Sequence, residues 1–376
     1  MREGAWTTQL GRDTESFKTM PHAAGNMTRA HRSRGAHALA DDSTHSPSDL
    51  PLRALVRIAL CLTALSSLST LELRETTPPA RAHHALAYDP RTQRVLLTAG
   101  STPRDSGRTF EFFNDLWAFD GRRWTELPTS GDRISGTALT FDVRRGRMIS
   151  WGGYDGSARG DLRVLESDGW RTVRTYDDMR LSEPGTVYDA RRGRLVAFGG
   201  SARRGHAYGD TWEHDGTRWH RVDAEGPPAR QGHVMVFDAR RGRVVVFGGM
   251  GAGGEGGRPP ILGDTWEYDG ERWVRLEVAA PTPRMSAGAT YDARRGMVVV
   301  FGGSGSEGFL ADTWGWNGRE WRRLSDTGPG RRAMGQLAYD AARDRIVLFG
   351  GRSGYPNGDL ADTWEWNGTS WTRFGD

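Results

Sequence analysis

The sequence predicts an all-β chain that folds as a six-bladed β-propeller with four antiparallel strands in each blade. A twelve-residue segment, a turn followed by an apolar strand, recurs six times at a spacing of about fifty residues. The chain also holds 51 Gly and 15 Trp, which suit tight turns and aromatic packing in all-β repeats. The copies are DPRTQRVLLTAG from Asp89, DVRRGRMISWGG from Asp142, DARRGRLVAFGG from Asp189, DARRGRVVVFGG from Asp238, DARRGMVVVFGG from Asp292 and DAARDRIVLFGG from Asp340.

Each repeat contains four extended segments joined by short turns. In residues 230–276 they read GHVMVFD, RVVVFGG, DTWEYDG and RWVRL. A tight turn from Asp238 to Gly242 joins the first two, and Asp269-Gly270, a strong hairpin dipeptide, joins the last two. The equivalent turns are Asp120-Gly121, Asp215-Gly216, Asn317-Gly318 and Asn367-Gly368, with a shortened version at Asp168-Gly169.

The apolar β-branched segments read as strands that are buried on both faces. A four-stranded sheet cannot bury both of its faces alone, so neighbouring sheets must stack, and radial stacking gives a propeller. An open solenoid is the competing arrangement. The third-strand tryptophans are therefore expected to be inter-blade core and not ligand platforms: Trp212, Trp266, Trp314 and Trp364.

The repeat resembles the Kelch repeat of bacterial-type proteins. The resemblance rests on the pattern PPAR…H…YD…RVVVFGG…DTWEYDG…W..L and covers about residues 79–374. It implies a six-bladed propeller of the Kelch and galactose oxidase-like superfamily. Two blades depart from the pattern, because Ala99-Gly100 replaces the paired glycines and DLRVLESDGW, from Asp161, lacks the third-strand tryptophan. We expect these two blades to pack less well.

The propeller is expected to span residues 77–376, after two segments of different character. Residues 1–50 are polar and aperiodic, so they are either a disordered tail or an extension upstream of the true translation start. Residues 51–76 contain the apolar run 58–71 after Arg53 and Arg57, which resembles a secretory signal peptide or, if uncleaved, a membrane anchor over residues 54–71. An extracytoplasmic location follows, periplasmic or secreted.

The sixth repeat ends with its own outer segment near Asp376. We therefore expect the ring to close by side-chain packing between the first and sixth blades, without a strand from the N-terminal region.

Charge and cysteine content narrow the function. The 51 basic residues nearly balance the 47 acidic ones and form no dedicated motif, so a nucleic-acid partner is not expected. Cys61 is the only cysteine, which excludes an internal disulfide, a cysteine-based metal site and the cysteine-linked copper chemistry of galactose oxidase. No metal or other cofactor is expected.

Enzyme motifs are weak. Gly249, Gly251 and Gly254 match GxGxxG, but Pro259 and Pro260 follow and no helix opens there. There is no HExxH motif and no phosphate-binding loop, and the Asp-Gly-x-x-Trp segments lack the residues that precede them in sialidase boxes. We assign no catalytic residue.

The long connections, from second to third strand and from blade to blade, should share one face, the long-loop face, where binding usually resides. An arginine precedes each first strand there, and a ring of guanidinium groups would attract anions. His83 and His233 lie close by without metal-ligand spacing. The candidate arginines are Arg81, Arg133, Arg180, Arg230, Arg284 and Arg332.

The alternative for these arginines is structural. Each could pair, as a blade-to-blade staple, with the aspartate that begins a third strand: Asp115, Asp161, Asp210, Asp264, Asp312 or Asp362.

The sequence thus favours an exported, non-catalytic binding module whose ligand, a protein or a glycan, occupies the long-loop face. The alternative is a carbohydrate-active enzyme of the same superfamily, such as a sialic-acid epimerase-like isomerase, which the fold alone does not exclude. An acid–base partner for that chemistry would be Glu183 or Glu307.

Overall fold

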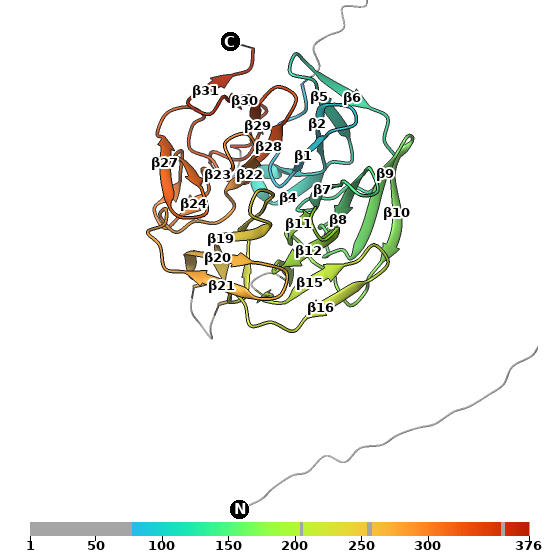
Figure 1. The fold of residues 1–376 in the computed structure, drawn as a ribbon. Coiled ribbons are helices and arrows are strands. Elements are labelled where there is room, and N and C mark those ends of the chain that lie inside the picture. Colours follow the sequence, from blue (N-terminus) through green and yellow to red (C-terminus); the bar gives the residue numbers. More distant parts are fainter. Residues whose placement is uncertain (1–76, 204–205, 254–257, 355–357, 376) are drawn as a thin grey trace, which may run out of the picture. The chain divides into compact units, whose positions relative to one another are not determined.

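The chain forms six radial four-stranded sheets around one axis, as the computed structural model of residues 77–203, 206–253, 258–354 and 358–375 shows (Figure 1). Strands that follow one another in the chain pair antiparallel within each sheet. The predicted all-β, six-bladed propeller is confirmed. The segments predicted for residues 1–50 and 51–76, Cys61 included, lie outside the described residues.

The first three blades occupy residues 85–222. Blade 1 contains β1 (Ala85–Asp89), β2 (Arg94–Thr98), β5 (Leu116–Phe119) and β6 (Trp124–Leu127). Blade 2 contains β7 (Ala138–Asp142), β8 (Arg147–Trp151), β9 (Asp161–Glu166) and β10 (Gly169–Thr175). Blade 3 contains β11 (Gly185–Asp189), β12 (Arg194–Phe198), β15 (Thr211–His214) and β16 (Trp219–Val222).

The last three blades follow in the same order. Blade 4 contains β18 (Val234–Asp238), β19 (Arg243–Gly251), β20 (Ile261–Tyr268) and β21 (Trp273–Leu276), with β17 (Arg230–Gln231) added on β19. Blade 5 contains β22 (Gly288–Asp292), β23 (Met297–Phe301), β26 (Thr313–Trp316) and β27 (Trp321–Ser325). Blade 6 contains β28 (Gln336–Asp340), β29 (Arg345–Phe349), β30 (Thr363–Trp366) and β31 (Trp371–Arg373).

Local sequence explains the repeated strand pair. In β19 the run from Val244 to Phe247 is at most 1% exposed, as expected for a strand covered on both faces. The turn before it closes because Asp238 accepts the Arg241 N–H on its carboxylate at 3.1 Å and the Gly242 N–H on its carbonyl at 2.8 Å. Gly242 takes a φ of 65°, a left-handed conformation that favours glycine.

The paired glycines at the end of the second strand let the next blade approach. A Cβ on Gly248 would lie 2.4 Å from the Arg284 carbonyl oxygen of blade 5. Any side chain there would push the two blades apart, which is the physical reason for the repeated glycine pair.

The ring closes by packing between the first and last blades, which lie side by side in Figure 1. Leu86 and Val95 of blade 1 share one buried cluster with Val347 and Phe349 of blade 6. Blade 6 takes all four of its strands from residues 336–373. The predicted closure without a strand from the N-terminal region therefore agrees with the structure of the described residues.

Four third-strand tryptophans, one in each of blades 3 to 6, are half-buried. Each one packs against a core cluster, and the indole N–H of three of them donates to the aspartate two residues earlier. The core role predicted for these side chains fits their packing. The tryptophans are Trp212, Trp266, Trp314 and Trp364.

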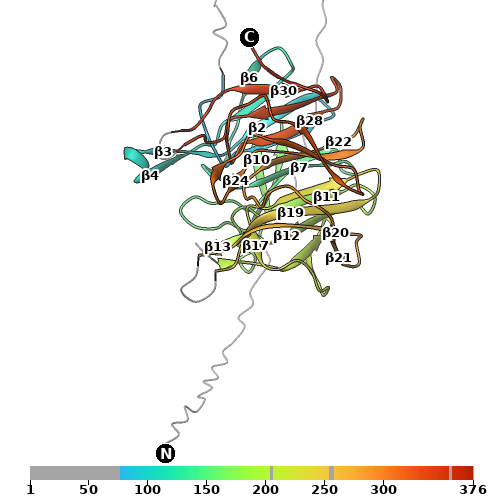
Figure 2. The same cartoon turned by 90° about the vertical axis from the view of Figure 1, so that its left-hand side faces the viewer.

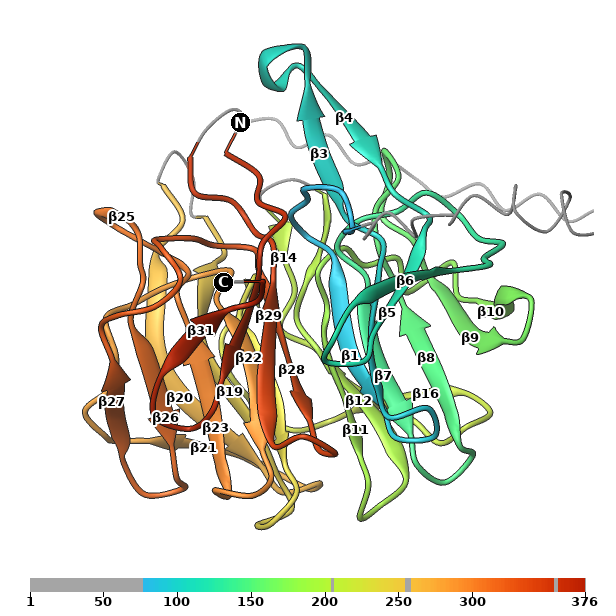
Figure 3. The same cartoon turned by 90° about the horizontal axis from the view of Figure 1, so that it is seen from above.

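Three short hairpins extend from the long-loop face: β3 (Ser101–Arg104) with β4 (Thr109–Phe112), β13 (Ser201–Arg203) with β14 (His206–Ala207), and β24 (Ser304–Gly305) with β25 (Gly308–Phe309). The first includes the single-turn helix η1 (Asp105–Gly107) and stands out furthest from the ring (Figures 2 and 3). The short Asp-turn hairpins lie on the opposite side, the hairpin face. No helix among the described residues has the length and apolar character to cross a bilayer.

Candidate functional site

The innermost strands of the six blades surround a central channel. This channel opens on the long-loop face between six residues, one from each blade. Each residue stands just before the innermost strand in a left-handed backbone conformation, with φ between 51° and 61°. Together they surround a cavity of about 210 Å³. We call them the mouth residues: His83, Gly136, Glu183, Gly232, Ser286 and Met334.

The left-handed conformation is held by backbone hydrogen bonds from blade to blade. A non-glycine residue pays a steric cost in this region, so four such residues in one ring require a compensating contact. Five mouth residues donate their backbone N–H to the carbonyl of the mouth residue of the preceding blade. The bonds are His83 to Met334 at 3.3 Å, Gly136 to His83 at 2.8 Å, Glu183 to Gly136 at 2.9 Å, Ser286 to Gly232 at 2.6 Å and Met334 to Ser286 at 2.8 Å. The mouth is therefore a rigid collar that also links blade 1 to blade 6.

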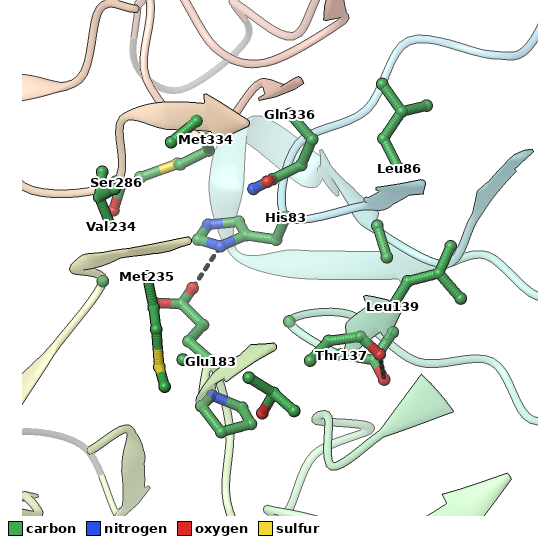
Figure 4. A pocket seen from close by; sticks show the side chains of 18 of the residues that line it. His83, Leu86, Thr137, Leu139, Glu183, Val234, Met235, Ser286, Met334 and Gln336 are labelled. Carbon is green, nitrogen blue, oxygen red and sulfur yellow. Dashed lines mark hydrogen bonds and ion pairs between the residues drawn. The ribbon is translucent and has the colours of Figure 1, made fainter. Parts of the chain in front are cut away.

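His83 and Glu183 meet across this opening (Figure 4). His83 Nδ1 contacts Glu183 Oε1, although the residues belong to blades 1 and 3. Blade 2 contributes Gly136 between them, and glycine leaves the space for the contact. Both side chains keep access to water, at 25% and 30% exposed.

The pKa of Glu183 lies below its usual value. Burial is the largest single influence and raises this pKa. The charge of His83 and its hydrogen bond lower the pKa, and their combined effect exceeds that of burial. Glu183 is therefore a carboxylate at neutral pH that faces a partner able to donate a proton. Such a pair can bind a polar ligand or exchange protons with it.

Other polar groups on the cavity wall are available or already engaged. Gln336 and Ser286 make no hydrogen bond through their side chains to another described residue, and Gln336 points toward His83 (Figure 4). Thr137 is engaged, because its hydroxyl lies 2.7 Å from Ser150 Oγ and donates to the Trp151 carbonyl at 3.0 Å. No group of three or more His, Cys, Asp or Glu in the described part of the chain could hold a metal ion.

Two further histidines line the cavity just below the mouth. His84 packs edge-on against Phe349 of the preceding blade, and His233 does the same against Phe198. Burial, and after it the charge of the neighbouring Arg81 or Arg230, lowers the pKa of each imidazole to about 3. Both rings are neutral at physiological pH and act as aromatic wedges between blades. His233, a predicted site residue, thus lies on the wall with both ring nitrogens buried.

The side chains of four of the six predicted arginines are fully hydrogen-bonded inside their own blades. Arg230 is 0% exposed, pairs with Asp264 through two bonds of 2.7 and 2.9 Å, and donates to the carbonyls of Gly248 and Pro228. The same arrangement recurs in the pairs Arg81–Asp115, Arg284–Asp312 and Arg332–Asp362.

Each of these arginines bonds the preceding blade through its backbone and its own blade through its side chain. The Arg284 N–H donates to the Leu262 carbonyl and its carbonyl accepts the Gly249 N–H, both of blade 4, while its guanidinium group holds Asp312 of blade 5. The arginine–aspartate pairing expected as the structural alternative is thus found in four blades, where it fastens neighbouring blades to each other. Burial raises the Asp264 pKa, and the hydrogen bonds from Arg230 and Trp266 lower it below its usual value. Ligand binding by these arginines stays a prediction, and their guanidinium groups present no open surface.

Arg133 and Arg180 are displaced from this set by one residue. Ile134 and Leu181 take the buried position in blades 2 and 3. Arg133 donates to the Phe112 carbonyl at 3.0 Å, and Arg180 contacts Asp177, both at exposed positions. The aspartates of these blades use other partners: Asp161 pairs with Arg159 and Arg163, and Asp210 with Arg221.

Sequence reasoning named His83 and Glu183 but did not pair them. An alignment of the repeats on the strand that follows, instead of on the nearest arginine, would have placed both in one ring. Glu307 is not part of the mouth, since it is exposed in the turn between β24 and β25.

No protein-family model matches the chain, and no curated protein is detectably similar to it in sequence.

Proposed function

We propose that the chain is an exported, non-catalytic binding module of the Kelch type, which holds a protein or carbohydrate on its long-loop face. The observation that carries this proposal is a set of three exposed aromatic side chains. Phe110, Tyr154 and Tyr208 are 46%, 39% and 41% exposed. They lie in the second-to-third-strand connections of three consecutive blades, so all three are on this face.

Exposed aromatic side chains on a rigid scaffold are typical anchors for sugars and proteins, since they offer large apolar area at low cost in conformational entropy. Phe112 of the β3–β4 hairpin contacts Tyr154 of blade 2 edge-on, at 6.1 Å between ring centroids. This contact braces the projecting hairpin against the next blade.

The size of the mouth cavity favours a ligand that lies over the opening. Its volume of about 210 Å³ is below the roughly 300–1,000 Å³ of pockets that enclose small molecules. His83 and Glu183 would then contact one projecting polar group of a larger ligand.

The test is a glycan-array screen of the full chain, followed by affinity measurements on the glycans that bind. If no glycan binds, the protein partner is identified by cross-linking and its affinity is measured instead. The variant Phe110→Ser/Tyr154→Ser/Tyr208→Ser is expected to lose at least tenfold in affinity. The matched control is Val173→Ser/Val274→Ser, which changes two residues 44% exposed on the outer strands β10 and β21. Unchanged affinity in the aromatic variant would overturn the assignment to this face.

Export is supported by the apolar run 58–71 and is tested separately. Expression in a bacterial host, with fractionation and N-terminal sequencing, should yield an extracytoplasmic protein. An intact chain confined to the cytoplasm would refute export.

The second candidate, an acid–base enzyme, is favoured by the His83–Glu183 pair alone. A carboxylate beside an imidazole in a water-accessible cavity is the arrangement that general acid–base catalysis uses. An epimerase acting on an acidic sugar would also need a cationic group there, and no arginine is among the described residues that line the cavity. NMR detection of sialic-acid epimerisation by the native chain, abolished in Glu183→Gln, would favour this candidate over the binding module.

A further inference from the structure

The opposite end of the channel widens into a second cavity of about 410 Å³, which we call the hairpin-face chamber. The penultimate residue of every innermost strand is aromatic and lines it: Tyr88, Phe141, Tyr188, Phe237, Tyr291 and Tyr339. The chamber begins where the mouth cavity ends, since both share the lining residues Leu86, Leu139, Thr186, Met235, Ala289 and Leu337.

The hydroxyls of two of these tyrosines bond the turns and do not face the chamber. Tyr339 donates to Asp344 at 3.0 Å, and Tyr291 accepts the Arg240 backbone N–H at 3.3 Å. Burial, followed by the hydrogen bond and charge of a nearby carboxylate, raises the pKa of both tyrosines to about 12. These side chains are therefore neutral phenols whose rings supply an apolar wall.

Arginines follow the chamber lining on blades 2 and 3. Val143 and Ala190 line the chamber, and the exposed Arg144 and Arg191 come directly after them. Arg144 donates to the Arg191 carbonyl and Arg191 to the Arg241 carbonyl, each at 3.1 Å. The guanidinium groups thus reach from one blade to the next around the rim.

These rim arginines keep their charge uncompensated. Within the described residues no carboxylate pairs with Arg144, Arg191 or Arg240, whereas the second arginine of each doublet is neutralised. Arg145 pairs with Asp142, Arg192 with Asp189 and Glu213, and Arg241 with Asp238 and Glu267. The aromatic chamber is thus bordered on blades 2 and 3 by guanidinium groups that pair with no described carboxylate, and Arg240 is the equivalent residue of blade 4.

We propose that the hairpin-face chamber is a binding site for a small amphipathic anion, an aryl or alkyl carboxylate or sulfonate. The apolar part of the ligand fills the aromatic ring, and its anionic group meets Arg144, Arg191 and Arg240. The volume suits such a ligand, since pockets for small molecules span roughly 300–1,000 Å³. Guanidinium groups recognise planar anions through paired hydrogen bonds. This site is independent of the ligand proposed for the long-loop face.

The experiment is a fluorescence titration of the full chain with 8-anilinonaphthalene-1-sulfonate, with competition by decanoate and by decanol. We expect saturable binding that decanoate displaces at least tenfold more effectively than decanol. The substitutions Val143→Asp and Arg144→Gln/Arg191→Gln should each weaken binding at least tenfold. Both change exposed residues, so the variants are expected to fold, and a cooperative thermal transition checks this.

The matched controls are Val274→Asp, 44% exposed on β21, and Arg272→Gln, whose side chain is 79% exposed. Neither residue lines the chamber, so both variants should bind as the native chain does. Equal displacement by decanoate and decanol would overturn the anionic part of the proposal. Unchanged binding in the folded Val143→Asp variant would overturn the site itself.

Discussion

The indole N–H of Trp124 donates to Thr363 Oγ1 at 2.9 Å, and this buried bond joins the first blade to the last. The equivalent bond from the fourth-strand tryptophan to the threonine of the preceding blade recurs as Trp273–Thr211, Trp321–Thr265 and Trp371–Thr313. Blades 2 and 3 lack it, since Leu116 and Leu162 stand at the threonine positions of blades 1 and 2. The Trp219 indole N–H of blade 3 has no partner among the described residues.

Removing this closing bond should destabilise the ring. A double-mutant cycle with Trp124→Phe and Thr363→Val is expected to give a coupling energy of about 1 kcal/mol, the usual net value of a buried hydrogen bond. Urea denaturation measures it. Trp219→Phe serves as the control, because it makes the same change of side chain at a position where the indole N–H has no hydrogen bond to lose among the described residues. A coupling energy near zero would show that the bond does not contribute to closure.

The buried arginines should matter for stability far more than the exposed ones. Arg230→Met leaves Asp264 as an unpaired, largely buried charge and should cost about 3–5 kcal/mol of unfolding free energy. Adding Asp264→Asn should recover part of the loss. Arg133→Met, at an exposed site, should stay within about 0.5 kcal/mol. Equal losses at the two positions in chemical denaturation would contradict the staple.

The two histidines of the channel wall, His84 and His233, should destabilise the protein in acid. Their folded pKa of about 3 lies below the ordinary value of 6.5, so the unfolded chain binds more protons between these limits. Their contribution is complete above pH 6.5 and declines as the pH falls, by about 2 kcal/mol per imidazole at pH 5. His233→Phe should flatten the curve of stability against pH measured by chemical denaturation, and an unchanged slope would contradict this role of the imidazole.

The His83–Glu183 pair predicts a change in one pKa. His83→Gln removes the charge that lowers the Glu183 pKa, so burial then dominates and the pKa should rise. Carbon-13 NMR titration of the glutamate carboxyl groups measures it. In the native chain the depressed pKa stabilises the fold above the ordinary glutamate value, and this contribution is lost as the pH falls through the folded pKa. If the pKa read from that carboxyl resonance is the same in His83→Gln as in the native chain, His83 does not lower the pKa of Glu183.

Deleting residues 1–76 should leave a folded propeller, since blades 1 and 6 build all their strands from residues 85–127 and 336–373. Near-ultraviolet circular dichroism and cooperative unfolding report on the fold. A molten or insoluble fragment would mean that the N-terminal region supplies a closing element.

The repeat predicted the blades well because each turn and strand is encoded locally. The segment from Asp238 carries the hydrogen-bonding carboxylate, the left-handed glycine and the buried valines within twelve residues. Looser packing in the first two blades stays a prediction.

The site was harder to predict, because its contacts depend on side-chain direction and on distant blades. Choosing the arginine nearest to each strand did not distinguish Arg133, which is exposed and one residue further from its strand, from Arg230, which is buried. The meeting of His83 with Glu183 needs the ring geometry and the absence of a side chain at Gly136. Neither condition is visible in a single repeat.

In the collar of mouth residues, one backbone conformation carries side chains of different chemistry. The backbone of all six positions has nearly the same shape, yet the side chains are an imidazole, a carboxylate, a hydroxyl, a thioether and two hydrogens. Met334 packs with Ala82 and Ala333, and the contact of His83 with Glu183 needs Gly136, so these positions depend on their neighbours. The opening is in this sense a surface on which side chains vary over one backbone shape, and substitutions there could define new selectivities without redesign of the scaffold.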